Sequence, residues 1–224
     1  MLITPFLACL PVVLPQGDCS NSSTGLMPLT DLGQNLYLGQ FQGGLYPGGL
    51  NLPPAVHAQE GEARGQALRP LDPDGAPSLN GRIGLVSIGM STTSQEFCSD
   101  VSFPPCAPTS FMAKSSSNAG IDPRVVPING AALGEVTSRW VSPTQANYDR
   151  IRDQWLMPAG MSELQVQVAW VKLSSINPTV SLPAPASDAL IMLVELANVV
   201  RALRIRYPNL AQVFFSSRHY GAMA

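Results

Sequence analysis

The first candidate for chemistry is Ser91, which follows the apolar run Arg82-Ile-Gly-Leu-Val-Ser-Ile-Gly89-Met90. A strand that breaks at a glycine can hold a serine hydroxyl clear of the sheet edge, with backbone N–H groups beside it to receive an oxyanion. This pattern indicates a serine hydrolase. The alternative is an ordinary turn between a strand and a helix, in which Gly89 relaxes the backbone and Ser91 or Thr92 caps the helix.

Further polar clusters follow three other apolar segments that are predicted to be strands. They are Asn129 to Thr137, Trp170 to Ser175 and Ser216 to Tyr220. Because the carboxyl ends of parallel strands meet at one edge of a sheet, we expect these clusters to converge with Ser91. A nucleophile from one loop, with glycine N–H groups and polar side chains from its neighbours, is the arrangement that acyl transfer requires.

The elements that must position these residues alternate along the chain. We expect strands over residues 82–90, 124–129, 165–172 and 211–217, and helices over residues 57–68, 110–118, 143–157 and 186–207. In the last helix, apolar residues recur at helical spacing and form a stripe that we interpret as core: Leu190, Leu193, Val194, Ala197, Val200 and Leu203. Strands joined by helical crossovers predict an α/β fold with a parallel sheet covered on both faces.

Composition restricts the class of partner. The chain has 224 residues, of which 45% are hydrophobic and 12% are charged, and it has a formal net charge of -2. This suits one compact domain, over residues 81–224, preceded by a loop-rich extension over residues 18–80 that we expect to pack on it. Without a basic run, neither nucleic acid nor an anionic membrane surface is an expected partner, and a small or neutral molecule is.

The first residues and the cysteines bear on location. Residues 1–15 are apolar but short and broken by proline, so we expect no membrane span and interpret residues 1–17 as a degenerate export signal. Cys98 and Cys106 are separated by a distance that a disulfide can close. Zinc ligation is the alternative use of four cysteines, but there is no Cys-x-x-Cys pair and there are only two histidines. We therefore expect no metal, no cofactor and a secreted or periplasmic location.

The order of these segments resembles that of the SGNH or GDSL-type hydrolases, and more closely that of a group of secreted bacterial proteins of uncharacterised activity that are similar to them. The resemblance covers residues 30–224. It rests on Tyr37 to Pro47, Ser87 to Phe97, Asn129 to Gly134, Gln165 to Lys172 and Pro208 to Tyr220. It implies a three-layer α/β/α fold with a mostly parallel sheet of the flavodoxin-like SGNH type.

The resemblance also implies roles for individual residues. Ser91 matches the nucleophile, with Met90 where those enzymes usually carry aspartate, and Gly134 matches the glycine whose N–H helps to bind the oxyanion. Lys172 falls near the place of the third-block asparagine, where a charged lysine would attract an oxyanion more strongly. Asn129 is a further binding candidate. The alternative interpretations are that Lys172 is a surface lysine, that Gly134 is a turn glycine and that Asn129 caps the end of a strand.

The resemblance is incomplete at the end of the chain. The family carries aspartate and histidine as Asp-x-x-His after the last strand, and the sequence ends at Ala224 without this block. We therefore expect a C-terminally truncated domain, in which His219 is the candidate base beside Arg218 and Tyr220 as binding residues. His57 is the weaker candidate.

Three functions remain open from the sequence. The first is an exported serine esterase or acetylesterase that acts on an ester, such as that of an acetylated carbohydrate. The second is a module that binds a polar ligand without chemistry, and the third is a truncated relic without activity.

Overall fold

The computed structural model describes residues 27–99 and 105–216, and the chain divides into two compact units, residues 1–52 and 53–224. This division falls after Leu52, whereas composition places a boundary at residue 80. Residues 53–80 contact the sheet of the second unit directly. Leu71 forms bridges with Pro77 and Arg82, and Gln165 Nε2 donates to the Leu71 carbonyl at 2.6 Å.

The described part of the first unit contains several glycines at turns. Its two short antiparallel strands are β1 (Leu36–Tyr37) and β2 (Phe41–Gln42). Gly49 has a φ of 72°, and a side chain there would meet the backbone of Gly33, so that only glycine permits this close turn. The described part of this unit, residues 27–52, therefore consists largely of tight turns.

The second unit contains a four-stranded parallel sheet in the order β4-β3-β5-β6. The strands are β3 (Ile83–Gly89), β4 (Val125–Ile128), β5 (Val166–Lys172) and β6 (Gln212–Phe215). The helices are α1 (Ala55–Ala67), α2 (Ser91–Phe97), α3 (Phe111–Ser116), α4 (Ala146–Ile151) and α5 (Asp188–Arg206). This confirms the α/β class and the parallel sheet, with helices flanking it as a three-layer α/β/α arrangement requires.

Among the described residues, three short helical segments join these elements. They are η2 (Thr137–Arg139), the π-helix η3 (Arg152–Leu156), which continues α4, and η4 (Glu163–Gln165). The helix expected over residues 143–157 is thus α4 with η3. Among the residues that the structure describes, no helix is long and apolar enough to cross a membrane.

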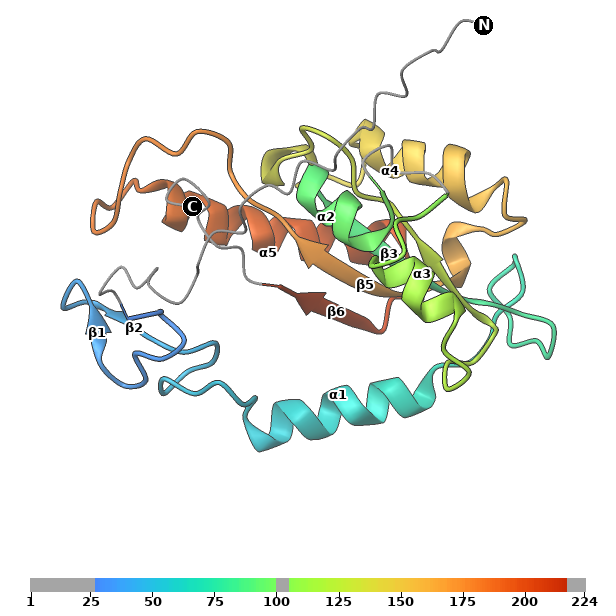
Figure 1. Ribbon diagram of the computed structural model, residues 1–224, viewed down its shortest axis with the longest axis horizontal. Coiled ribbons are helices and arrows are strands. Elements are labelled where there is room, and N and C mark those ends of the chain that lie inside the picture. The colour runs from blue at the N-terminus through green and yellow to red at the C-terminus, as the bar shows by residue number, and fades with distance from the viewer. Residues whose placement is uncertain (1–26, 100–104, 217–224) are drawn as a thin grey trace, which may run out of the picture. The chain divides into compact units, whose positions relative to one another are not determined.

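The two faces of the sheet differ in what they carry (Figure 1). On one face, alternate residues of β3 and β5 enter the main core with α4 and α5: Val86, Ile88, Ala169, Val171, Tyr148, Ile151, Val199 and Leu203. The opposite face is covered by α2 and α3. There the ring of Phe97 stacks between those of Phe111 and Trp170, with centroids 4.9 Å and 5.8 Å apart.

The core stripe expected on α5 is wrong at every position except Leu203: Leu193, Val194 and Ala197 are exposed, and Leu190 and Val200 are half-buried. Only Val199, Ala202 and Leu203 are buried on this helix, whereas Leu193 and Val194 are 64% and 62% exposed. A helix of 19 residues spans about 28 Å at 1.5 Å per residue. The four residues of the neighbouring β6 span about 13 Å. The helix is therefore longer than β6, and its first half contains no buried residue.

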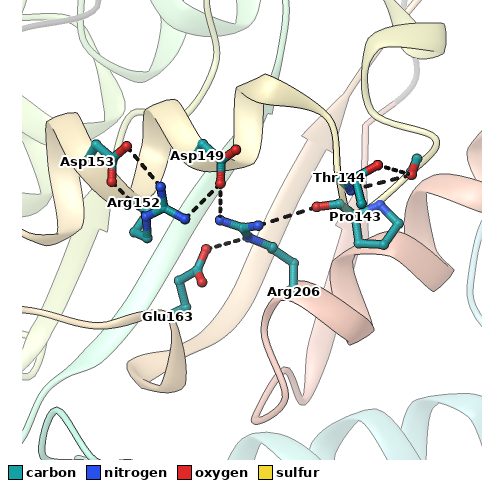
Figure 2. Close-up of polar contacts among 8 residues, drawn as sticks. Pro143, Thr144, Asp149, Arg152, Asp153, Glu163 and Arg206 are labelled. Carbon is teal, nitrogen blue, oxygen red and sulfur yellow. Dashed lines mark hydrogen bonds and ion pairs between the residues drawn. The ribbon is translucent and has the colours of Figure 1, made fainter.

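An ion-pair network, which we call the Arg206 network, closes the amino-terminal edge of the core (Figure 2). Arg206, at the end of α5, donates from Nη2 to Asp149 on α4 at 2.7 Å and from Nε to Glu163 on η4 at 2.6 Å. Arg152 donates to the same Asp149 carboxylate at 2.8 Å. The network therefore joins α4, η4 and α5 at the edge opposite to Ser91.

Candidate functional site

Ser91 is the first residue of α2 and lies at the carboxyl edge of the sheet, two residues after the end of β3. In the strand order, β4 and β5 lie on opposite sides of β3. After β3 the chain passes first to β4 and later to β5, so Ser91 lies at the point where the direction of the strand order reverses. Ligands of open α/β sheets bind in the crevice at such a switch point. The N-cap of α2 is Met90 and no side chain caps the helix, so neither Ser91 nor Thr92 has the capping role considered above.

The Ser91 side chain is half-buried, and its hydroxyl makes no hydrogen bond with another described residue. Its position is set by the helix that carries it. A helix of seven residues is too short to be stable by itself, so tertiary contacts must hold α2 in place. The described contacts of α2 reach β4, β5 and the segment before α3.

Lys172 binds α2 at two points. It ends β5 in register with Gly89, and its carbonyl accepts a hydrogen bond from Thr93 Oγ1 at 2.7 Å. Its ammonium donates to both carboxylate oxygens of Glu96, at 2.6 Å and 2.8 Å. The Lys172 side chain is only 17% exposed, and its charge is balanced by Glu96 at the carboxyl edge.

Asn129 lies in the interior beneath α2. Its Oδ1 accepts a hydrogen bond from Ser87 Oγ at 3.0 Å, and its Nδ2 donates to the hydroxyl and the carbonyl of Ser94, at 3.1 Å and 3.2 Å. Asn129 and Ser87 are fully buried. The amide thus connects β3, the end of β4 and α2.

The loop after β4 crosses the switch point. The backbone N–H of Ala132 donates to the carbonyl of Gly89, and that of Thr137 donates to the carbonyl of Ser174, both at 3.2 Å. Arg150 on α4 supports the start of the loop by donating to the Gly130 carbonyl at 2.6 Å, and burial lowers the pKa of its guanidinium. Contacts from β3, β5 and α4 therefore position this loop.

Gly134 lies in this loop and is exposed, with a left-handed φ of 73° and no atom within 4 Å of the place of a Cβ. An alanine here would be strained by the backbone conformation alone. Gly134 is therefore a turn residue on the surface, near the carboxyl edge of the sheet.

The structure thus brings Ser91, Lys172, Asn129 and Gly134 to one edge of the sheet. Asn129 lies below α2 and Gly134 on the surface. Arg218, His219 and Tyr220 lie outside the described residues. His57 is on α1 and exposed.

The residues that hold α2 were not candidates in the sequence. They are Ser87, Thr93, Ser94 and Glu96. Ser87 carries a signal, because it is a polar residue within an otherwise apolar strand and a buried hydroxyl needs a partner. Glu96 carries none, since a surface glutamate on a short helix is ordinary until the position of Lys172 is known.

A surface pocket of about 410 Å³ lies at the opposite, amino-terminal edge, and its lining includes Arg69, Leu79, Ile83, Asp122 and Arg124. Arg124 donates from Nε and Nη2 to the two oxygens of Asp122, at 2.9 Å and 2.6 Å. These hydrogen bonds lower the pKa of Asp122 to about 2. The charge of Arg124 is thus paired within the chain, and this pocket lies away from Ser91.

Cys98 and Cys106 form a disulfide, as their spacing allowed. Comparison of the chain with family models, with curated proteins and with solved structures gives no match.

Proposed function

We propose that this protein is a serine ester hydrolase of SGNH-like type, with Ser91 as the nucleophile. The observation that carries the proposal is the place of Ser91: a half-buried hydroxyl with no hydrogen bond to a described residue, at the switch point of a parallel sheet. It stands on a helix that is held to two neighbouring strands. A nucleophile has to be held in this way, because misplacement by about 1 Å costs orders of magnitude in rate.

In the proposed reaction, Ser91 Oγ attacks the acyl carbon of an ester while a base removes the hydroxyl proton. The tetrahedral intermediate then expels the alcohol, which takes up that proton, and water hydrolyses the acyl-serine to release the acid. His219 is the proposed base and lies outside the described residues. Lys172 and the Gly134 N–H are the proposed groups that stabilise the oxyanion, and Asn129 supports α2 from below.

The proposed substrate is a small neutral ester, such as an acetyl ester of a carbohydrate. The balanced charges of Lys172 and Glu96 support a neutral rather than an anionic ligand. Arg218 and Tyr220 are proposed binding residues, and a secreted or periplasmic location fits the disulfide.

Labelling with an alkyl fluorophosphonate tests the proposal. We expect one adduct per chain, located at Ser91 by peptide mass spectrometry, and hydrolysis of p-nitrophenyl acetate. Ser91→Ala should abolish the adduct and lower hydrolysis at least about 10³-fold. Ser116→Ala is the matched control, because this exposed serine on α3 bonds only to its own helix.

An unlabelled but folded wild-type protein would contradict the proposal. Binding of an acetylated oligosaccharide that survives Ser91→Ala would then identify a ligand-binding module on the same sheet.

A further inference from the structure

The disulfide between Cys98 and Cys106 lies at the far end of the helix that carries Ser91. Cys98 is the C-cap of α2 and is fully buried, while Cys106 is partly exposed. The backbone N–H of Cys98 donates to the Ser94 carbonyl at 2.8 Å, and its carbonyl accepts from Ala107 at 2.8 Å. The cystine therefore joins the last turn of α2 to the segment that enters α3.

The same end of α2 is connected through Ser94 to the residue that follows β4. Ser94 Oγ donates to the carbonyl of Ser99, the residue after Cys98, at 3.0 Å. Ser94 also accepts the hydrogen bonds from Asn129 described above. Displacement of the chain at Cys98 and Ser99 would thus disturb the contact between α2 and β4.

Because α2 is short, a displacement at its last turn also reaches Ser91 in its first turn. The helix has seven residues, about two turns, so that loss of its last turn leaves too few internal hydrogen bonds to maintain the first. Other contacts of α2 are those of Phe97 with Phe111 and Trp170, and those of Thr93 and Glu96 with Lys172.

We propose that this disulfide is a redox switch for the Ser91 site, an inference that rests on the proposed function. With the disulfide closed, α2 holds Ser91 in its reactive position; with two thiols, the last turn of α2 frays and Ser91 loses reactivity. A dithiol reduces the bond by attack of one thiolate on the sulfur of Cys106, the more exposed of the two residues, which releases the Cys98 thiolate. The second thiol then displaces Cys106, leaving two protein thiols and the oxidised dithiol. The site would therefore be active only where the disulfide persists, in an oxidising compartment.

The test compares the rate of fluorophosphonate labelling at Ser91 before and after treatment with dithiothreitol. We expect labelling to slow at least about 10-fold on reduction and to recover on reoxidation. A Cys98→Ser/Cys106→Ser variant should be permanently slow and insensitive to dithiothreitol. A Cys9→Ser/Cys19→Ser variant is the control for the other thiols and should keep the full response.

Hydrogen exchange gives a second reading that does not depend on activity. On reduction, amides of residues 92–98 should exchange faster, while those of residues 199–203 in the core of α5 should not change. An equal labelling rate in the oxidised and reduced proteins would overturn the switch and leave the hydrolase intact. Faster exchange throughout the core would overturn it as well, because the disulfide would then support the whole fold. An oxidised wild type that is not labelled at Ser91 contradicts the proposed function and the switch together.

Discussion

Gly89 is a residue at which β3, α2 and β5 approach one another closely. A Cβ there would overlap Thr93 Oγ1 and lie 2.5 Å from the carbonyl of Lys172, and that carbonyl belongs to a strand that cannot shift without breaking its pairing. A side chain at residue 89 would therefore push α2 and Ser91 away from β5.

We expect Gly89→Ala to lower the free energy of unfolding by roughly 2 to 3 kcal/mol, measured by urea denaturation. Gly61→Ala on α1 is the control, because no atom lies within 4 Å of its Cβ position. Alanine favours a helix by about 1 kcal/mol over glycine, so that this variant should keep or gain stability. Equal urea midpoints for Gly89→Ala and the wild type would show that the close approach is not tight.

At the scale of the element, α2 is defined by its contacts rather than by its own sequence. Thr93 and Glu96 bind Lys172, Ser94 binds Asn129, and Phe97 stacks on Trp170. Two adjacent threonines of α2 differ in whether their hydroxyl helps to attach the helix to β5. Thr93 Oγ1 bonds to β5, whereas Thr92 Oγ1 is buried with no partner among the described residues.

This difference predicts opposite results for two variants of the same shape. Thr93→Val should lower the free energy of unfolding by about 1 to 2 kcal/mol, because the hydrogen bond to the Lys172 carbonyl is lost. Thr92→Val should be neutral or stabilising, because it replaces an unpaired hydroxyl with a methyl group. Thermal unfolding of the two variants side by side checks this, and a larger loss for Thr92→Val would contradict the assignment of contacts.

At the scale of the whole unit, the Arg206 network closes the core at the edge opposite to Ser91 (Figure 2). The Arg206 side chain is 16% exposed, and its partners Glu163 and Asp149 are 23% and 44% exposed. Removal of the arginine leaves the partly buried carboxylate of Glu163 without this ion pair and leaves Asp149 paired with Arg152.

We expect Arg206→Gln to lower the free energy of unfolding by about 2 kcal/mol, less than a fully buried pair would cost. Arg152→Gln is the matched control: its side chain is 39% exposed, and we expect a loss below about 1 kcal/mol. Urea denaturation at low salt and in 1 M NaCl measures both. A loss for Arg206→Gln no greater than that for Arg152→Gln would contradict a structural role for the network.

Much of the fold could be predicted from local pattern. The strands expected over residues 82–90 and 165–172 are β3 and β5 to within one residue at each end, because apolar runs bounded by polar or glycine residues are typical of buried parallel strands. The stripe on α5 could not be predicted in the same way. Periodicity shows that a helix has an apolar face, but the packing of the helix against the sheet decides which of its residues are buried: Val199 and Ala202 are buried, whereas Ala197 is exposed.

The sequence by itself determined the α/β class, the four strands of the parallel sheet, the place of Ser91 after an apolar strand and the cysteine pair that could close. These follow from side-chain type and short-range spacing. Only the tertiary structure decided that Asn129 lies under α2, that Glu96 binds Lys172 and that Arg206 joins three elements. Glu96 and Lys172 are 76 residues apart in the sequence. Such contacts depend on strand order and helix placement, which the packing of the whole unit selects.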